Sequence, residues 1–224
     1  MTLNARAWLA LVILALAIGA LLFSCAGTLQ YWHAWTFLAV FIGASAAITL
    51  DLMRRDPALL ERRMRGGPTA EKEASQRVIM LFTSAGFSAL LVVPALDFRY
   101  HWSHVPLLAV VIGNVLVAVG FYFIALVYRE NTFTSATVQV VADQKVVTTG
   151  PYAIVRHPMY ASALLYLIGI PMALGSWWGF MPLAAMLPFL IWRLLDEERL
   201  LTRELAGYRE YQSRVRYRLV PFVW

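Results

Sequence analysis

The sequence predicts an all-α fold, a polytopic membrane helix bundle of about six spans, because long parts of the chain carry no charge. Of its 224 residues, 60% are hydrophobic and only 14% are Asp, Glu, Lys or Arg. Those charged residues are absent from residues 7–50, 78–96, 100–128 and 157–192. A helix on a soluble protein needs a polar or charged face, so uncharged stretches of this length indicate surroundings of hydrocarbon.

The lengths of these stretches divide them into spans. A helix needs about 20 apolar residues to cross a bilayer, so the first and last stretches each fit two spans. The fifth span is the shortest. The predicted spans are Ala7–Leu29, Tyr31–Leu50, Val78–Leu96, Val105–Val127, Met159–Leu174 and Trp177–Leu195.

Basic residues predict how the chain is oriented. Lys and Arg collect in cytoplasmic loops, and here they follow spans two, four and six, whereas Arg99 alone lies on the other side. We therefore expect both termini in the cytoplasm, which in a prokaryote makes this a protein of the cytoplasmic membrane. The pI near 9.7 fits contact with anionic lipid head groups. It does not indicate nucleic-acid binding, which would need a compact basic domain with interleaved aromatic residues.

Metal and disulfide chemistry have little support in the sequence. Cys25 is the one cysteine and falls within the first span, which excludes an internal disulfide and a paired-cysteine metal site. His101 and His104 on the outer loop have the spacing of two ligands but lack a third. No metal is expected.

The chain divides near residue 128 into a front part of four spans, residues 1–127, and a polar back part, residues 128–224. In the front part, the basic loop predicts a short helix over Pro57–Met64, broken at the Gly-Gly-Pro of residues 66–68.

In the back part, two segments have the composition of strands, Thr137–Val141 and Val146–Thr149. Pro158 suits the first position of a helix, which makes His157 its N-cap. The free amides at such a helix start can hold an anion.

Two motifs in the back part resemble a known family. Val147–Tyr152 reads VTTGPY and Val155–Tyr160 reads VRHPMY, similar to the signature of isoprenylcysteine carboxyl methyltransferases. The segment Asp196–Pro221, which begins with Asp-Glu-Glu, resembles the second signature of that family. Phospholipid N-methyltransferases are similar in kind. The resemblance covers residues 128–224 well and residues 54–63 weakly, and Ser162 stands where the family often has glycine.

The resemblance implies a methyltransferase that uses S-adenosylmethionine, bound from the cytoplasm, and a lipophilic acceptor that enters from the bilayer. Carboxyl O-methylation is the reaction of the best-known members, while amine and thiol acceptors stay open. The helix start at His157 suits the cofactor's carboxylate, and a carboxylate with aromatic faces suits its positive charges. The expected cofactor contacts are Gly150, Tyr152, His157, Pro158, Tyr160, Glu197 and Glu198, the expected substrate contacts are Arg156, Tyr211 and Arg214, and the expected catalytic residues are Arg156 and Glu198.

Other interpretations of these residues and of the chain stay open. Arg156 could be an interface charge, and Glu197 with Glu198 a solvated helix face. Tyr208 and Tyr211 are of a type that often anchors helices at the membrane surface. For the whole chain, the alternatives are a sterol-type reductase that uses NADPH, or a transporter or structural membrane protein.

Overall fold

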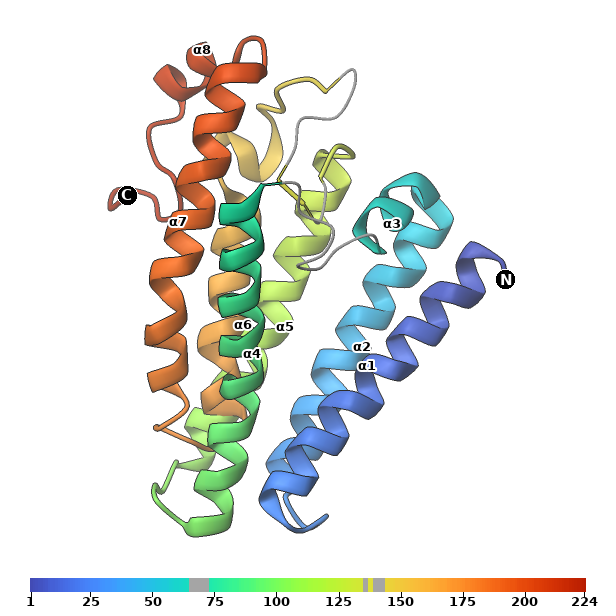
Figure 1. Cartoon of the computed structure of the whole chain (residues 1–224), viewed down its shortest axis with the longest axis vertical. Helices are drawn as coiled ribbons and strands as arrows, with labels where there is room; N and C mark the ends of the chain where they lie inside the picture. The colour runs from blue at the N-terminus through green and yellow to red at the C-terminus, as the bar shows by residue number, and fades with distance from the viewer. Residues whose placement is uncertain (65–72, 135–136, 139–143) are drawn as a thin grey trace.

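The computed structural model describes residues 1–64, 73–134, 137–138 and 144–224, and this part of the chain is helical throughout its regular structure (Figure 1). The helices follow one another along the chain as α1 (Leu3–Ala26), α2 (Trp32–Arg55), α3 (Pro57–Met64), α4 (Ala74–Tyr100), α5 (Leu107–Glu130), the 3-10 turn η2 (Gly150–Ala153), α6 (Pro158–Ala173), α7 (Phe180–Glu204) and α8 (Tyr208–Arg214).

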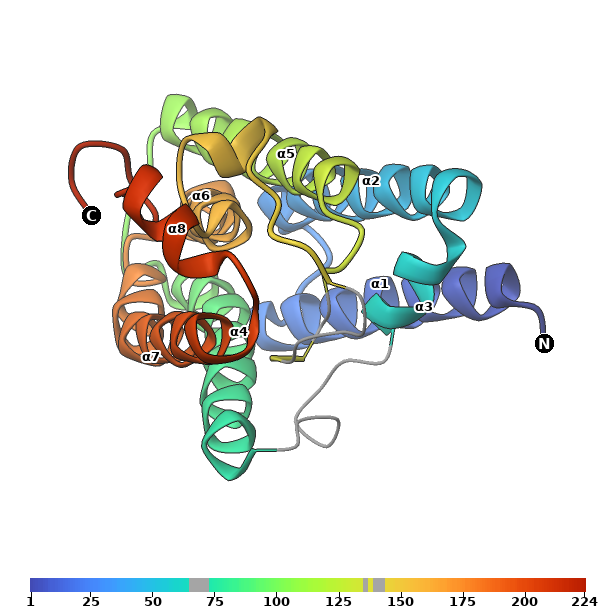
Figure 2. The ribbon, with the colours of Figure 1, turned by 90° about the horizontal axis from the view of Figure 1, so that it is seen from above.

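Four of these helices are long and apolar enough to cross a membrane, namely α1, α2, α4 and α5. Helix α6 is apolar but has 16 residues, and α7 is apolar only as far as Trp192. Both run beside α4 and α5 in Figure 1, and the view from above in Figure 2 shows α6 between α5 and α7. The predicted all-α membrane bundle is confirmed.

The smaller expectations had mixed outcomes. The short helix over Pro57–Met64 and the capping position of His157 are confirmed. The strand over Val146–Thr149 is wrong, because this segment has no regular structure and Val146 packs on the aromatic residues of α8 instead. The other expected strand begins with a bend at Thr137 and Val138, and its remaining residues lie outside the described ones, as does the break at residues 66–68.

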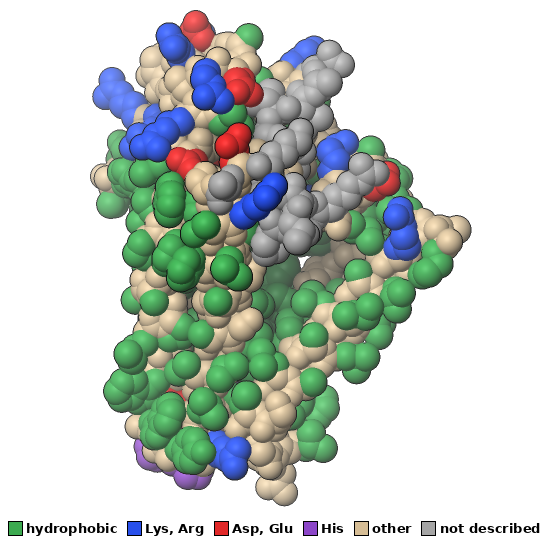
Figure 3. Space-filling model, viewed as in Figure 1, with side chains coloured by type: hydrophobic (Ala, Val, Ile, Leu, Met, Phe, Trp, Pro, Cys, Tyr) green, Lys and Arg blue, Asp and Glu red, His purple; other side chains and the backbone are tan. Residues whose placement is uncertain are grey.

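Charge separates the two ends of the bundle. Figure 3 shows a hydrophobic middle zone, with most Lys, Arg, Asp and Glu of this face gathered over the end that carries α3 and α8. Both termini lie toward that end, and an ion pair of 3.8 Å joins Arg6 of α1 to Glu61 of α3. The opposite end holds the short connections that follow α1, α4 and α6.

Buried polar contacts join those three connections. Asp97 accepts hydrogen bonds from the backbone N–H of Ser103 at 2.8 Å, from the Ser103 hydroxyl at 2.6 Å and from the Ser176 hydroxyl at 2.5 Å. Tyr31 donates to the carbonyl of Leu174 at 2.5 Å. A carboxylate with three donors can be buried at little cost, so this end of the bundle is closed.

Small residues bring α5 and α6 into close contact. Gly113 and Gly120 lie seven residues apart on α5, and they face Gly169 and Ser162, which have the same spacing on α6. A Cβ atom on Gly120 would lie 2.8 Å from the backbone nitrogen of Tyr166 and 2.9 Å from the carbonyl oxygen of Ser162. Helices in a bilayer associate through such close backbone packing, since lipid supplies no hydrophobic drive between them. The contact sets the position of α6, which begins at the proline of the Arg-His-Pro motif.

Replacing Gly120 should therefore weaken the bundle. Gly120→Ala places a methyl group against the backbone of α6 and should lower stability by about 1–3 kcal/mol, measured as the thermal unfolding midpoint in detergent. Gly43→Ala on α2 is the matched control, because a Cβ there meets nothing within 4 Å. Equal midpoints for the two variants would contradict the close contact.

Candidate functional site

A cavity of about 400 Å³ lies at the charged end of the bundle, bounded by α4, α5, α6 and α7 and by the segment that precedes η2. Cavities of about 300–1,000 Å³ are typical of small-molecule sites. The described residues around this cavity form two chemically different ends, one polar and one apolar.

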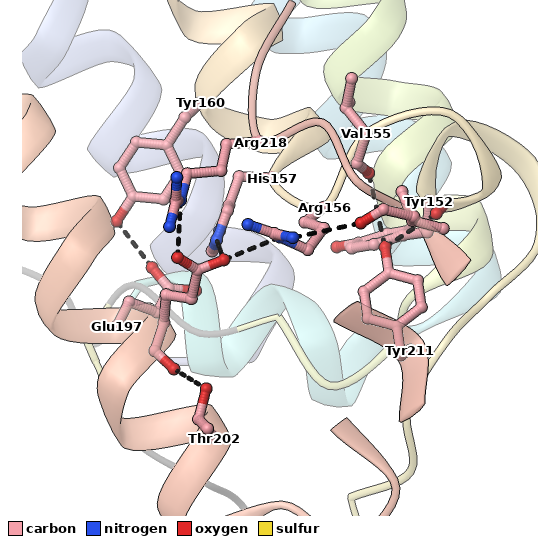
Figure 4. A network of polar contacts seen from close by, with 11 residues as sticks. Tyr152, Val155, Arg156, His157, Tyr160, Glu197, Thr202, Tyr211 and Arg218 are labelled. Atoms are coloured by element: carbon pink, nitrogen blue, oxygen red, sulfur yellow. Dashed lines mark hydrogen bonds and ion pairs between the residues drawn. The ribbon is translucent and has the colours of Figure 1, made fainter. Parts of the chain in front are cut away.

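The polar end contains a buried group that lacks a partner. The hydroxyl of Tyr208, a buried residue that lines the cavity, has no hydrogen-bond partner among the described residues. On another part of the wall, Tyr160 donates to Oε2 of Glu197 at 2.6 Å (Figure 4). Buried polar atoms are nearly always paired, and an unpaired one costs about 1–3 kcal/mol. The unpaired Tyr208 hydroxyl at this cavity therefore indicates a place for a polar ligand.

The apolar end lies among the membrane helices. Met80 comes from α4, Ile124 from α5, Ala163 and Tyr166 from α6, and Leu190 from α7. Figure 3 shows the surface hollowed within its hydrophobic zone, between α1 and α2 on one side and α4 on the other. The cavity can therefore accept a molecule with a polar head and an apolar body.

Burial also keeps the hydroxyls of the polar end protonated. Desolvation raises the pKa of Tyr208 well above its ordinary value, and the nearby charges of Glu198 and Glu197 raise it further. Desolvation likewise raises the pKa of Tyr152. These phenols are therefore neutral hydrogen-bond donors at any physiological pH.

Behind the polar wall, Glu198 is the centre of a buried charge network. Its Oε1 lies 2.7 Å from Nε of Arg156 and 3.7 Å from Nε2 of His157, and its Oε2 accepts a hydrogen bond from Arg218 Nε at 2.7 Å. Burial alone would raise the pKa of Glu198, but contacts with His157 and Arg218 and the charge of Arg156 lower it to about 2. The carboxylate is therefore ionised at neutral pH.

The same network attaches the C-terminal segment to the Arg-His-Pro motif. The backbone N–H groups of Arg156 and His157 donate to the carbonyls of Tyr217 and Arg218, each at 2.9 Å. The Arg156 side chain also donates to the carbonyl of Val215 at 3.2 Å. Figure 4 shows Arg156, His157 and Arg218 converging from these separate segments. Their positions thus depend on contacts that span about 60 residues of sequence.

A second hydrogen-bonded group supports the segment around η2. Tyr211 of α8 donates to the carbonyl of Tyr152 at 2.7 Å. Asn131, which follows α5, donates to the Tyr152 hydroxyl at 2.9 Å. The Tyr152 ring is thereby held at the cavity wall from both sides of the loop.

The structure brings most of the expected site residues to the cavity. Those that line it are Tyr152, Arg156, His157, Pro158, Tyr160, Glu197 and Tyr211. Gly150, Glu198 and Arg214 do not line it. The ligand contacts expected for all of these residues stay predictions.

The three outlying residues have local explanations. Gly150 has a φ of +56°, which favours glycine, and a Cβ there would meet the Glu130 side chain at 2.6 Å. Arg214 ends α8 with an exposed side chain. Glu198 is turned toward Arg218, on the far side of the Arg-His-Pro motif from the cavity.

Sequence reasoning missed several residues of the cavity. Met80 and Thr83 of α4, Asn131, Lys145 and Arg193 were not expected there. Arg193 gave a signal, because it is the first charge after the long uncharged stretch that ends at residue 192. Thr83 gave none, since a hydroxyl can bond within its own helix, and it does so with the carbonyl of Ile79 at 2.9 Å.

From the sequence, Tyr208 was interpreted as a residue that could anchor a helix at the membrane surface. The structure buries it at 4% exposure against Leu205 and Tyr211 instead. Tyr208 lines the cavity, and its hydroxyl has no hydrogen-bond partner among the described residues.

Comparison with known families agrees with this geometry. The family model described as phospholipid methyltransferase matches residues 108–207, which is 100 of the 224 residues. The match contains nearly all of α5, all of α6 and α7 and the segment between α5 and α6, which together supply most of the residues that line the cavity. The matching family is related to the isoprenylcysteine carboxyl methyltransferases, whose signatures the motifs resemble, but is distinct from them. No curated protein matches the chain.

Metal chemistry has no support in the same region. Across the described ranges, His, Cys, Asp and Glu nowhere form a group of three or more that could hold a metal ion.

The family match and the apolar helices together indicate a membrane methyltransferase, without identifying its acceptor.

The Glu198 network should make the stability of the folded protein depend on pH in the acid range. Glu198→Gln leaves Arg156 and Arg218 without their shared carboxylate and should cost roughly 3 kcal/mol at pH 7. The pKa of Glu198 is lowered from 4.5 to about 2 on folding, so its contribution is complete above pH 4.5 and is lost as the pH falls toward 2. The gap between wild type and variant should narrow over that window, measured by thermal unfolding at a series of pH values.

Glu204→Gln is the control for this experiment. Glu204 lies at the end of α7 in an exposed pair with Arg203, so its loss should cost less than about 1 kcal/mol at any pH. A gap between wild type and Glu198→Gln that stays constant from pH 7 to pH 2.5 would show that the carboxylate carries no special charge stabilisation.

Proposed function

We propose that this chain is an integral membrane methyltransferase that uses S-adenosylmethionine and acts on a lipophilic acceptor. The observation that carries the proposal is the cavity with two ends, whose polar wall includes Glu197 and Tyr208, with its unpartnered hydroxyl, and whose other wall is apolar. The family match over residues 108–207 supports the same reaction class.

The residues of the polar end fit the proposed cofactor. Its carboxylate suits the start of α6, where His157 is the N-cap and the first amides of the helix are free. Its cationic groups suit Glu197, which lines the cavity, and the faces of Tyr152 and Tyr160. The neutral Tyr208 hydroxyl is a donor that a nitrogen or oxygen atom of the cofactor can accept. When bound, the cofactor supplies a methyl group on a sulfonium, which an electron-rich acceptor atom can attack.

The protein's own contribution to such a displacement is positioning and the exclusion of water. Tyr160 and Glu197 hold one another through their 2.6 Å hydrogen bond, which sets the carboxylate on the cavity wall. Glu198 acts through others: it holds Arg156 and His157 in place and is in our proposal a positioning residue.

Two acceptor classes are compatible with the site. The sequence motifs favour the carboxylate of an isoprenylcysteine-like lipid, for which Arg193 or Lys145 on the cavity wall could supply the opposite charge. The family match favours the amine of a phospholipid, for which Glu197 could accept a proton. Mild base would release the transferred methyl group as methanol from a methyl ester, whereas an N-methyl group would stay on its nitrogen.

The Tyr208 hydroxyl allows a sharp test of the proposed cofactor. Tyr208→Phe removes a buried group that has no partner, so the free protein should unfold at the same or a higher temperature. Binding of S-adenosylmethionine should weaken by roughly 3- to 10-fold, the value of one hydrogen bond, measured by calorimetry in detergent.

Glu204→Gln is again the control and should bind like wild type, since it lies outside the cavity. NADPH should give no binding heat. Saturable binding of NADPH, without binding of S-adenosylmethionine, would contradict our proposal and indicate a reductase.

We also propose that the charged end of the bundle faces the cytoplasm, on the one-sided distribution of Lys and Arg. In a background with Cys25 changed to alanine, His104→Cys should react with an impermeant thiol reagent in intact cells, because His104 is exposed at the opposite end. Ser213→Cys in α8 should react only after the membrane is opened. The reverse pattern would invert the topology.

A further inference from the structure

A second hollow, separate from the cavity, lies on the outer side of α7 and α8. Its lining includes four arginines, Arg199, Arg203, Arg209 and Arg218, and shares no residue with the cavity. Thr202 and Gln212 add polar side chains, and Glu198 is its acidic member. We call this surface the arginine groove.

The arginines of this groove are available to an anion. Arg199 and Arg203 pair with Asp196 and Glu204, but these arginine side chains are about 75% exposed, and such pairs contribute little. The Arg209 side chain makes no hydrogen bond or ion pair with any residue that the structure describes. Arg218, in contrast, donates a hydrogen bond to the buried Glu198 carboxylate. A phosphate could therefore replace weak surface pairs with bidentate contacts.

The position of the groove points to a lipid phosphate. Trp192 is 41% exposed on α7, as expected for a residue at the membrane interface. Leu195 and Arg199 follow it at i+3 and i+7, on the same face of the helix. The groove thus begins one turn beyond the interface, at the level of the lipid head groups.

The C-terminal turn places apolar side chains next to this level. Phe222 is 88% exposed and has a φ of +66°, which bulky residues rarely adopt. The turn is held by bonds from the backbone N–H groups of Arg218, Leu219 and Val220 to the carbonyl of Trp224. Val220 and Val223 are exposed as well. A turn of this kind beside a cationic groove suits contact with acyl chains.

We propose that the arginine groove binds the phosphate head group of an anionic phospholipid, with the apolar turn at Val220–Val223 against its acyl chains. The site is independent of the methyltransferase cavity, and the proposal stands whatever the acceptor of that cavity is. Each arginine near an anionic surface contributes about 1 kcal/mol to lipid binding.

The test removes two groove arginines that take no part in the Glu198 network. The double variant R199Q/R209Q should bind short-chain phosphatidylglycerol roughly 30-fold more weakly than wild type, measured by native mass spectrometry or calorimetry in neutral detergent. The double variant R54Q/R216Q is the matched control, because both arginines are exposed at the charged end of the bundle and neither lines the groove. It should bind like wild type, and both proteins should unfold at the same temperature.

Three results would overturn the proposal. An equal loss of lipid affinity in both double variants would show that the arginines act only through general charge attraction. No loss of affinity in either variant would show that the lipid binds elsewhere. Binding of glycerol phosphate as tight as that of phosphatidylglycerol would assign the groove to a soluble anion, since the acyl chains would contribute nothing.

Discussion

The arrangement of the candidate site depends on one buried carboxylate. Glu198 draws together Arg156 and His157 from the loop before α6 and Arg218 from the C-terminal segment. These residues come from three separate parts of the chain, and an ion pair between buried side chains requires all of its partners, because a lone buried charge is costly. The network therefore fixes where the Arg-His-Pro motif lies relative to α7, and through it the start of α6 that forms the polar wall of the cavity.

Backbone packing inside the membrane supplies the second constraint. Glycines on α5 and small residues on α6 allow these two helices to touch, so the apolar walls of the cavity come from rigid elements. At the far end, Asp97 and the hydroxyls of Ser103 and Ser176 close the bundle. Hydrogen bonds from hydroxyls and a backbone amide to the single carboxylate of Asp97 thus join the helices at one end, and a network of ion pairs joins them at the other. The cavity lies beside this network, at the charged end of the bundle.

The two hollows on the charged end divide the chemistry between them. The cavity is lined by aromatic, apolar and a few polar groups, which suits a small cofactor next to a lipophilic molecule. The arginine groove is a more open, cationic surface at head-group level. Glu198 lines the groove and contacts Arg156 and His157 of the cavity wall, so the two regions meet at this carboxylate.

The sequence by itself determined the class of fold, the approximate position of each long helix and the short helix over Pro57–Met64, because local composition and hydrogen bonding within a helix depend on neighbouring residues. It also placed His157 at a helix start, since proline has one favoured position there. Only the tertiary structure decided that Tyr208 is buried, that Glu198 turns away from the cavity and that Met80 of α4 lines it. Helical periodicity defines a face but not the neighbour that covers it, and these contacts join residues far apart in the chain. The strand expected at Val146–Thr149 failed for the same reason: residues that favour strands form one only where a partner strand is present.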